Sequence, residues 1–595
     1  MDLGSGIDAA PVDAALEDAA LEDAAFEDAA LEDAAPEDAA PDDAAHADAG
    51  LGDAEAPDAM ASPSPVITTF TADPALLPRG GGAVTLAWAV TGATQLSVAP
   101  GVGDVTGQTM TLTTVTTTTT FTLTAVGPGG VDTATVTVRM GALFVDPVGG
   151  DDAASGLRTQ PLRTIGRAAS LAQTGDTVYL LDGTHEIPFV RFRPGITLRA
   201  VNVGGARVQL LPATNGALIF DGSADLHGFD VTSNSAFGFF QVSQGTLRVE
   251  ALHYTAPGPG TSAYPLVAAS GTAQVELVAP ADGEWCPTQC NTPFVAATDD
   301  ARVVVTGGRL RNFTQLYNLF STGGRAALTL RDLTIRDGSA QHVVALGNSG
   351  LGRNDSQVRL ERVTIRGVAS LAAVLVGFGA SSLVVDSSTI ADNPGVGVEF
   401  DSNGNYTPAV HTATIARSVL ARNLIGLREG LYARARVVLD TVEVRGNTQS
   451  GLACRFTAEG CWLDVRGGLV AEGGDRGLDA VTEGNKVNRV RLRGVTVRDN
   501  VGIGVDVTGL PGSLWDLGTP TSPGGNRLTG NGGSSVFVRD PTNPAWAVGN
   551  TWSPNVQGAD ALGRYAPGPG GYQELTGPVA AGANHQLVAG ARLRL

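Results

Sequence analysis

The chain has 595 residues, too many for one ordinary hydrophobic core, so several domains or an array of repeats are expected. Glycine is abundant (78 residues) and aromatic residues make up only 5%, a mixture that favours many short strands over helical bundles. Most of the net charge of -21 comes from residues 1–60, with 19 acidic residues and no Lys or Arg, while residues 141–595 hold 38 acidic and 37 basic residues. The folded part therefore has no basic excess of the kind that binds nucleic acid, and no apolar run is long enough to cross a membrane.

Residues 1–63 are expected to be a disordered acidic spacer. From Asp13 the pentapeptide DAALE and its variants repeat. Five residues advance about 140° around an α-helix, so the one apolar residue per repeat never forms a stripe. Dense negative charge makes the segment repel itself. It is either a stalk that lifts the following domains from a surface anchor upstream of residue 1, or an inert tail.

Residues 64–140 are predicted to form a small β-sandwich. Short runs of alternating apolar and polar residues are separated by Gly/Pro turns, and Trp88 is a candidate core residue. The ending TFTLTAVGPGGVDTATVTV resembles bacterial immunoglobulin-like domains, which implies a spacer without chemistry of its own.

The four cysteines form two local pairs, Cys286 with Cys290 and Cys454 with Cys461. A zinc site would need four converging ligands or nearby histidines, and the two pairs lie far apart in the sequence. Two small loop disulfides are therefore expected in place of a metal site or free thiols. This predicts an oxidising compartment, outside a bacterial cell or at its surface, and hence a signal or lipoprotein leader that has been removed.

A repeat of 24 to 30 residues runs through the second half of the chain. Two apolar residues stand two positions apart, and a third follows seven positions after the first. The pairs are Leu328/Leu330, Val358/Leu360, Leu383/Val385, Ala413/Ile415, Val437/Leu439, Leu463/Val465 and Val490/Leu492. This period predicts a right-handed parallel β-helix, an all-β fold in which each coil buries its apolar side chains against the next. We expect it over residues 141–565, with a closing segment at 566–595.

Asparagine stands ten positions after the start of four coils, at Asn393, Asn423, Asn447 and Asn500. We expect it in a turn at positive φ, where its amide can also bond to the asparagine of the next rung.

Residues 162–186 hold a single helix signal. Apolar residues on one helical stripe are Leu162, Ile165, Ala168, Ala169 and Ala172. The helix is expected to cover the open first rung and so to protect a strand edge, with residues 175–183 as that rung.

Residues 143–186 resemble the opening of a bacterial family of pectin-lyase-like β-helix proteins of undefined function. The matching residues are Val145, Asp146, Gly150, Asp151, Gly156, Pro161, Thr164, Ile165, Ala168, Gly175, Asp176 and Gly183. The stretches LGTPTSPGGNRLTGN and AVGNTWSPNVQGADALGRY resemble its closing coils. The resemblance implies the fold without an established activity. Related β-helix proteins include pectate lyases, polygalacturonases, tailspikes and adhesins, but only Asp299-Asp300 matches the residues that polygalacturonases need.

Two sets of charged residues are candidate site residues of the outer face. Glu361 and Asp386, each three positions after a coil start, are expected on adjacent rungs, as a catalytic carboxylate pair in which one pKa is raised. Arg336 and Arg366, eight positions after their starts, are candidate ligands of an acidic sugar. A solvated β-helix face would carry the same residues.

Long insertions at 347–355 and 401–411 fall at a similar offset in their coils, so they should share one edge of the β-helix. Candidate substrate-binding residues on this edge are Arg353, Asn403, Tyr406 and Arg455. The sequence DSNGN holds only part of a calcium loop, so Ca²⁺ is not supported by a full motif and no cofactor is evident. Tolerated insertions at exposed turns are the alternative.

These features lead us to expect an exported, cell-surface modular protein. Its β-helix would bind a polysaccharide or another surface component without turnover. The alternative is a polysaccharide lyase or glycoside hydrolase that acts on the outer face of the β-helix.

Overall fold

A computed structural model describes the chain from residue 63 onward, except for a set of gaps. These are 211–217, 234–238, 257–263, 348–354, 378, 402–409, 431–433, 455–459, 482–486, 509–512, 520, 534, 539–544, 547–549, 553–565, 568–572, 577–585, 588–590 and 595. The predicted acidic spacer therefore lies almost wholly outside the described residues. In the described part, no helix has the length and apolar character needed to cross a membrane.

The first folded region is a sandwich of two sheets, both mainly antiparallel. One sheet contains β1 (Val66–Asp73), β3 (Gly82–Thr91) and β6 (Met110–Val115). The other has the order β2 (Leu76–Leu77), β8 (Gly130–Met140), β7 (Thr119–Gly127), β4 (Gln95–Ala99) and β5 (Gly103–Asp104). Trp88 is buried in its core and its indole nitrogen donates to the carbonyl of Gln108, as expected of a core tryptophan. The immunoglobulin-like resemblance stays a prediction.

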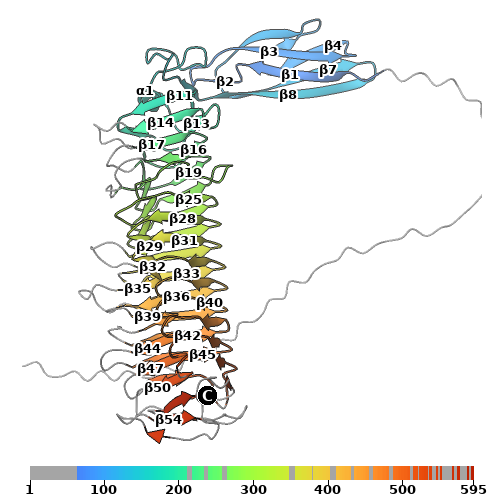
Figure 1. Ribbon diagram of the computed structural model, residues 1–595. Helices are drawn as coiled ribbons and strands as arrows, with labels where there is room; N and C mark the ends of the chain where they lie inside the picture. Colours follow the sequence, from blue (N-terminus) through green and yellow to red (C-terminus); the bar gives the residue numbers. More distant parts are fainter. Residues whose placement is uncertain are drawn as a thin grey trace, which may run out of the picture. The chain divides into compact units, whose positions relative to one another are not determined.

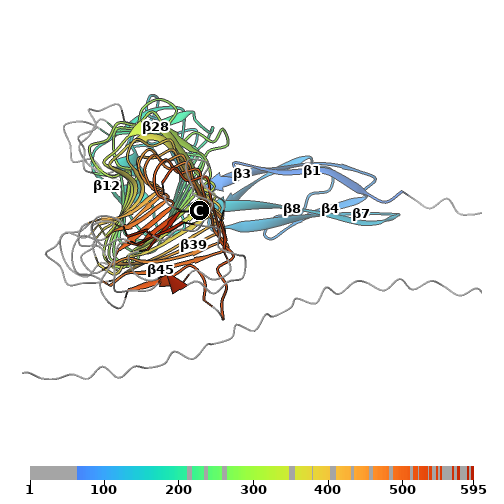
Figure 2. The same ribbon diagram turned by 60° about the horizontal axis from the view of Figure 1, so that its bottom comes forward.

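From residue 142 to residue 552 the described chain is a right-handed parallel β-helix, which confirms the predicted fold (Figure 1). Three stacks of parallel strands surround one apolar interior, as Figure 2 shows from another direction. The first sheet runs from β9 (Ala142–Val145) and β10 (Thr177–Leu180) to β51 (Ala545–Trp546). The second runs from β11 (Gly183–Ile187) to β20 (Tyr254–Thr255) and resumes from β25 (Arg309–Arg311) to β52 (Thr551–Trp552). The third runs from β12 (Val190–Phe192) to β50 (Val536–Val538).

The repeat read from the sequence is confirmed as the first two strands of each coil. Leu328 stacks on Val358 and Val358 on Leu383 in the first sheet, and all three are buried. Ile335 and Ile365, seven positions after their coil starts, stack in the same way in the second sheet. Alternate residues of each strand point inward because the side-chain period of a strand is two.

The asparagine ladder is confirmed, but its predicted backbone conformation is wrong. Asn393 Nδ2 donates to Asn423 Oδ1 at 3.0 Å, and Asn500 Nδ2 donates to Asn531 Oδ1 at 2.8 Å. The positive φ belongs to the residue before each predicted asparagine: Asp392 (58°), Arg422 (51°), Gly446 (62°) and Asp499 (55°). The left-handed residue makes the turn, and the asparagine after it places its amide in the buried interior.

The predicted capping helix is present as α1 (Ile165–Leu171), which contacts β9, β11 and β12. Its buried residues are Ile165, Ala168 and Ala169. Thr164 caps its N-terminus by accepting from the backbone N–H of Arg167 at 3.1 Å. The prediction that residues 175–183 form the first rung is wrong, because β9 pairs in parallel with β10 and precedes it in the stack.

Both predicted disulfides are present, Cys286–Cys290 and Cys454–Cys461. The first lies where the second sheet is interrupted between β20 and β25, next to the fully buried Trp285. The second closes the chain between β41 (Leu452–Ala453) and β42 (Trp462–Arg466).

Candidate functional site

Glu361 and Asp386 lie on adjacent rungs, as the sequence predicts. They end β30 (Gln357–Glu361) and β33 (Ser382–Asp386), and the strand register pairs them directly. Arginines hold both carboxylates: Arg331 Nε is 2.7 Å from Glu361 Oε2, Arg359 also contacts Glu361, and Arg417 contacts Asp386. The structure thus supplies a charge partner for each member of the pair.

The raised pKa expected in this carboxylate pair is not found at Glu361. Hydrogen bonds from Arg359 and Arg331 lower the pKa of Glu361, and they outweigh the opposite effect of its burial. An ionised, arginine-bound carboxylate has no proton to give, so Glu361 is not suited to act as a general acid at neutral pH.

Arg336 and Arg366 stack on each other in the second sheet, on β28 (Thr334–Ser339) and β31 (Thr364–Ala369). Arg366 Nε forms an ion pair with Asp392 at 2.6 Å, and Arg336 Nε lies 3.5 Å from Asp337. In the described part of the chain, no hydrogen bond or ion pair joins either arginine to Glu361 or Asp386. The two predicted sets are therefore not brought into one site by direct contacts.

The four predicted loop residues fall outside the described residues. They are Arg353, Asn403, Tyr406 and Arg455. Their expected clustering on one edge stays a prediction.

An aromatic side chain between two arginines stands out on the first sheet. Arg436 on β39 (Ala435–Asp440), Trp462 on β42 and Arg489 on β45 (Arg489–Arg493) occupy the same register position of consecutive rungs. The Cζ atom of Arg436 lies 3.9 Å from the centroid of the Trp462 ring, and that of Arg489 lies 5.8 Å from it. Both distances suit cation–π attraction. We call these three residues the Trp462 platform.

The Trp462 platform is open to solvent and hollowed. Trp462 is 36% exposed, whereas most large apolar side chains of the β-helix are buried in its interior. A hollow of about 290 Å³ is lined by the platform together with Val410, Arg434, Ala435, Gly460, Cys461 and Val487. Neither Arg436 nor Arg489 has a carboxylate partner among the described residues. The hollow therefore combines an aromatic side chain with two cations that have no carboxylate partner in the described part of the chain.

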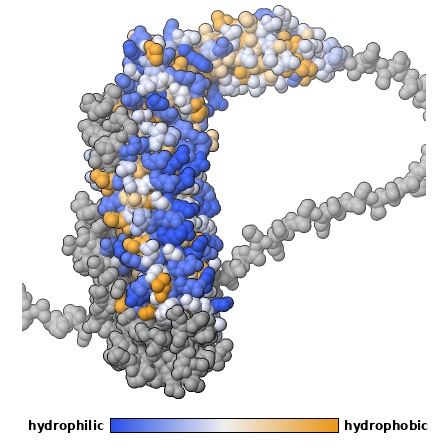
Figure 3. Space-filling model, viewed as in Figure 1, coloured by the Kyte–Doolittle hydropathy of each residue, from blue (hydrophilic) through white to orange (hydrophobic). Residues whose placement is uncertain are grey.

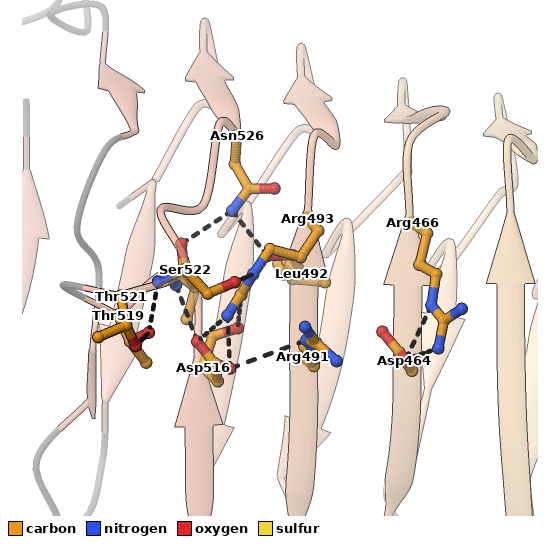
Figure 4. Close-up of polar contacts among 12 residues, drawn as sticks. Asp464, Arg466, Arg491, Leu492, Arg493, Asp516, Thr519, Thr521, Ser522 and Asn526 are labelled. Carbon is orange, nitrogen blue, oxygen red and sulfur yellow. Dashed lines mark hydrogen bonds and ion pairs between the residues drawn. The ribbon is translucent and has the colours of Figure 1, made fainter. Parts of the chain in front are cut away.

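Two carboxylates on neighbouring strands of this sheet, Asp464 and Asp516, are bound to arginines (Figure 4). Asp464 accepts two hydrogen bonds from Arg466, at 3.0 and 2.7 Å. Asp516 on β48 (Leu514–Asp516) accepts from Arg493 at 2.7 and 2.6 Å, and Arg491 lies 3.9 Å away. Asp464 and Asp516 therefore already have arginine partners and are not available to Arg436 and Arg489.

The visible face of the β-helix is otherwise hydrophilic. In Figure 3 most of the coloured surface along the stacked coils is hydrophilic, with scattered apolar residues. Exposed arginines are mostly tied to acidic neighbours, as in the paired Arg362 and Asp332 or Arg422 and Asp392. Arg436 and Arg489 differ from these arginines because they contact an exposed tryptophan and not an acidic side chain.

Sequence reasoning missed the Trp462 platform, although a signal for it was present. The residues one position before the coil starts at Val437, Leu463 and Val490 are those of the platform. The register that aligns Glu361 with Asp386 also aligns these three side chains on the outer face.

No protein-family model and no curated protein sequence matches the chain. Among solved structures, it is similar to the A-module of the mannuronan C-5 epimerase AlgE4 of Azotobacter vinelandii, with 10% identity, a TM-score of 0.32, and 69% of this chain and 97% of that chain covered. It is also similar to the family 28 exopolygalacturonase of Yersinia enterocolitica, with 11% identity, a TM-score of 0.25, and coverage of 69% and 96%. A rhamnogalacturonan lyase matches at 13% identity and a TM-score of 0.20, over 61% of this chain and 82% of its own. The fold rests on the strand register described above, and no site residue is transferred from these proteins.

Proposed function

We propose that the β-helix binds an acidic polysaccharide at the Trp462 platform, without turning it over. The observation that carries this proposal is the exposed Trp462 ring held between Arg436 and Arg489 in a hollow of the outer face. The exposed part of the Trp462 side chain offers an apolar contact to a sugar, and the guanidinium groups beside it bind carboxylates in a planar, bidentate way.

The charge balance supports an anionic ligand over a neutral one. The carboxylates of Asp464 and Asp516 are already bound to arginines, whereas Arg436 and Arg489 have no carboxylate partner in the described chain. A uronate sugar would supply the missing negative charge. Equivalent positions of successive coils recur along the β-helix at the spacing between neighbouring strands. Such a regular surface suits a long ligand made of repeated units.

Binding without turnover agrees with the state of the predicted catalytic pair. Arg331 and Arg359 hold Glu361, and Arg417 holds Asp386. Arginine nitrogens thus engage both oxygens of Glu361 and the Oδ1 atom of Asp386. The enzyme alternative therefore requires these ion pairs to open when substrate binds.

The rest of the chain fits a surface role. We propose that the β-helix is displayed outside a bacterial cell, with the sandwich as a spacer and the acidic segment as a stalk. Two disulfides support an oxidising compartment.

The test is calorimetric titration of the full chain with polygalacturonate and, separately, with neutral dextran. We expect binding of the first only, and weaker binding as salt is raised. Trp462→Ala or Arg489→Ala should weaken binding about tenfold or more, since anchoring Trp and Arg side chains often contribute about 1.4 kcal/mol or more each.

Arg302→Ala is the matched control, because Arg302 occupies the same register position of the same sheet, away from any aromatic neighbour. Equal losses in Arg302→Ala and Arg489→Ala would contradict a site at the Trp462 platform. Sustained release of unsaturated or reducing ends, with or without Ca²⁺, that disappears in Asp386→Asn would replace binding by the lyase or hydrolase alternative.

A further inference from the structure

A carboxyl group is buried in the apolar interior next to the second disulfide. Glu429 ends β38 (Leu427–Glu429), and its neighbour in the stack is Phe400. Glu429 is fully buried, and neither of its carboxyl oxygens has a hydrogen-bond partner. Leaving such a group unsatisfied is costly, so a polar side chain in this place calls for an explanation.

The donor atoms nearest to Glu429 belong to the two cysteines. One carboxylate oxygen of Glu429 and the Sγ atoms of Cys454 and Cys461 all lie within 4.8 Å of one another. Both cysteines are also buried, so all three potential ligands converge in a site shielded from solvent. Among the described residues this is the one group of three or more such side chains close enough to share a metal ion.

The backbone fixes the positions of the two cysteines. The N–H of Cys454 donates to the carbonyl of Asp479 at 2.7 Å, and the N–H of Cys461 donates to Asn488 Oδ1 at 2.7 Å. Glu429 lies one rung away on a strand of the same stack. Glu429 therefore lies on a strand of the β-helix, and each cysteine borders a strand and is anchored by its backbone N–H to a residue of the next coil.

We propose that the dithiol form of this chain binds a thiophilic divalent cation, with Zn²⁺ as the best fit, through Cys454, Cys461 and Glu429. Two thiolates and one carboxylate are a donor set that zinc accepts, with a fourth position left for water. The disulfide-bonded form and the metal-bound form are then two alternative states of the Cys454–Cys461 pair. In the disulfide state burial raises the pKa of the Glu429 carboxyl well above its ordinary value.

The two states differ by a balanced reaction. A newly made chain carries both cysteines as thiols, and Zn²⁺ displaces one proton from each thiol and one from the carboxyl of Glu429. Oxidation of the pair by a disulfide-containing oxidant removes two electrons from the two thiolates, forms the Cys454–Cys461 bond and releases the metal. The oxidant gains these two electrons and takes two protons from water to become a dithiol. The proton then returns to Glu429. The bound metal would thus keep Cys454 and Cys461 close together before the disulfide forms.

The test uses the full chain made under reducing conditions and kept with a phosphine reductant, alongside the oxidised chain. We expect one equivalent of Zn²⁺ by elemental analysis in the reduced chain and none in the oxidised one. Replacing Zn²⁺ by Co²⁺ should give a thiolate-to-cobalt charge-transfer absorption. Glu429→Gln should keep the size of the side chain but lower Zn²⁺ affinity at least about tenfold, the low end of the loss seen even for outer partners of metal ligands.

The matched control lies in the same chain. Cys286→Ser with Cys290→Ser removes a cysteine pair that is not part of any group of three ligand side chains close enough to share a metal ion among the described residues, and should leave the stoichiometry at one. Cys454→Ser with Cys461→Ser should abolish binding, with folding checked by circular dichroism. No Zn²⁺ in the reduced chain, or an unchanged affinity in Glu429→Gln, would overturn the proposal.

Discussion

His253 is held between two carboxylates from different coils. Its Nδ1 lies 2.9 Å from Asp230 Oδ1, and its Nε2 lies 3.0 Å from Asp282 Oδ2. An ionised carboxylate can only accept a hydrogen bond, so both ring nitrogens must donate, which only the imidazolium can do. Burial lowers the pKa of His253, but the hydrogen bonds to Asp230 and Asp282 outweigh burial, so the pKa is raised overall.

This geometry predicts a pH-dependent contribution to stability. A raised folded-state pKa means that the stabilisation is fully present below the unfolded pKa of about 6.5 and is lost as the pH rises through the folded pKa. His253→Gln should therefore lower the thermal midpoint at mildly acidic pH, where both carboxylates are still ionised. The difference from the wild type should shrink at alkaline pH.

A matched comparison is His227→Gln, because His227 has one carboxylate neighbour, Glu250, at 3.6 Å. His227→Gln removes one longer contact in place of two shorter ones, so it should lower the thermal midpoint at mildly acidic pH less than His253→Gln does. A difference between His253→Gln and the wild type that stays constant from acidic to alkaline pH would contradict the charged bridge.

At the scale of the structural element, the asparagine ladder stabilises the turn after the second strand. Asn423 Nδ2 donates to the carbonyl of Ile390 at 3.0 Å, and its backbone N–H donates to Asn447 Oδ1 at 2.9 Å. Its own Oδ1 accepts from Asn393. All of these groups are buried, so each bond replaces one that the group would make with water in the unfolded chain.

Asn423→Ala should destabilise the β-helix by about 3 kcal/mol, since it leaves buried groups of Ile390 and Asn393 without partners. Asn423→Asp should also destabilise, because the carboxylate cannot donate to Ile390. Denaturant unfolding measures both. Asn202→Ala is the control: Asn202 is exposed and bonds to Asp182 at the surface, so its loss should change stability by no more than about 0.5 kcal/mol.

The elements show how far the sequence specifies this fold. Inward pairs such as Leu328 and Leu330 are readable because alternation and burial leave an apolar repeat in the first strand. The third strand of each coil was missed. Its buried residues stand 14 to 16 positions after the coil start, as at Val344 and Leu427. Because the turn before it varies in length, these residues do not recur at a fixed spacing in the sequence. The left-handed conformation at Arg422 was missed because stacking between coils, not the residue type, imposes it.

The candidate site was less predictable than the fold. The register that pairs Glu361 with Asp386 was readable, but their binding to Arg331 and Arg417 depends on side-chain directions that a repeat does not specify. Glu429 shows the same limit, because a single acidic residue in a loose repeat gives no sign that it points into the interior.

At the scale of the whole molecule, the β-helix is a one-dimensional stack in which each coil contacts mainly the coils on either side. Strand pairing links β34 (Thr389–Ala391) to β37 (Val419–Ala421), and β37 to β40 (Glu443–Arg445). The stability of such a stack is close to a sum of coil and nearest-neighbour terms. Damage to one coil should therefore stay local, unlike damage to a globular core.

Leu420→Ala tests this locality. Leu420 is fully buried between Ile390 and Val444 of the adjacent coils, so the cavity should cost about 2–5 kcal/mol. Hydrogen exchange should speed up in β34, β37 and β40, while β14 (Ala206–Leu210), many coils away, keeps its protection. Thr414→Ala, an exposed change in the preceding strand of the same coil, should leave both regions unaltered. Equal acceleration in β14 and β37 after Leu420→Ala would mean that the coils unfold as a single cooperative unit.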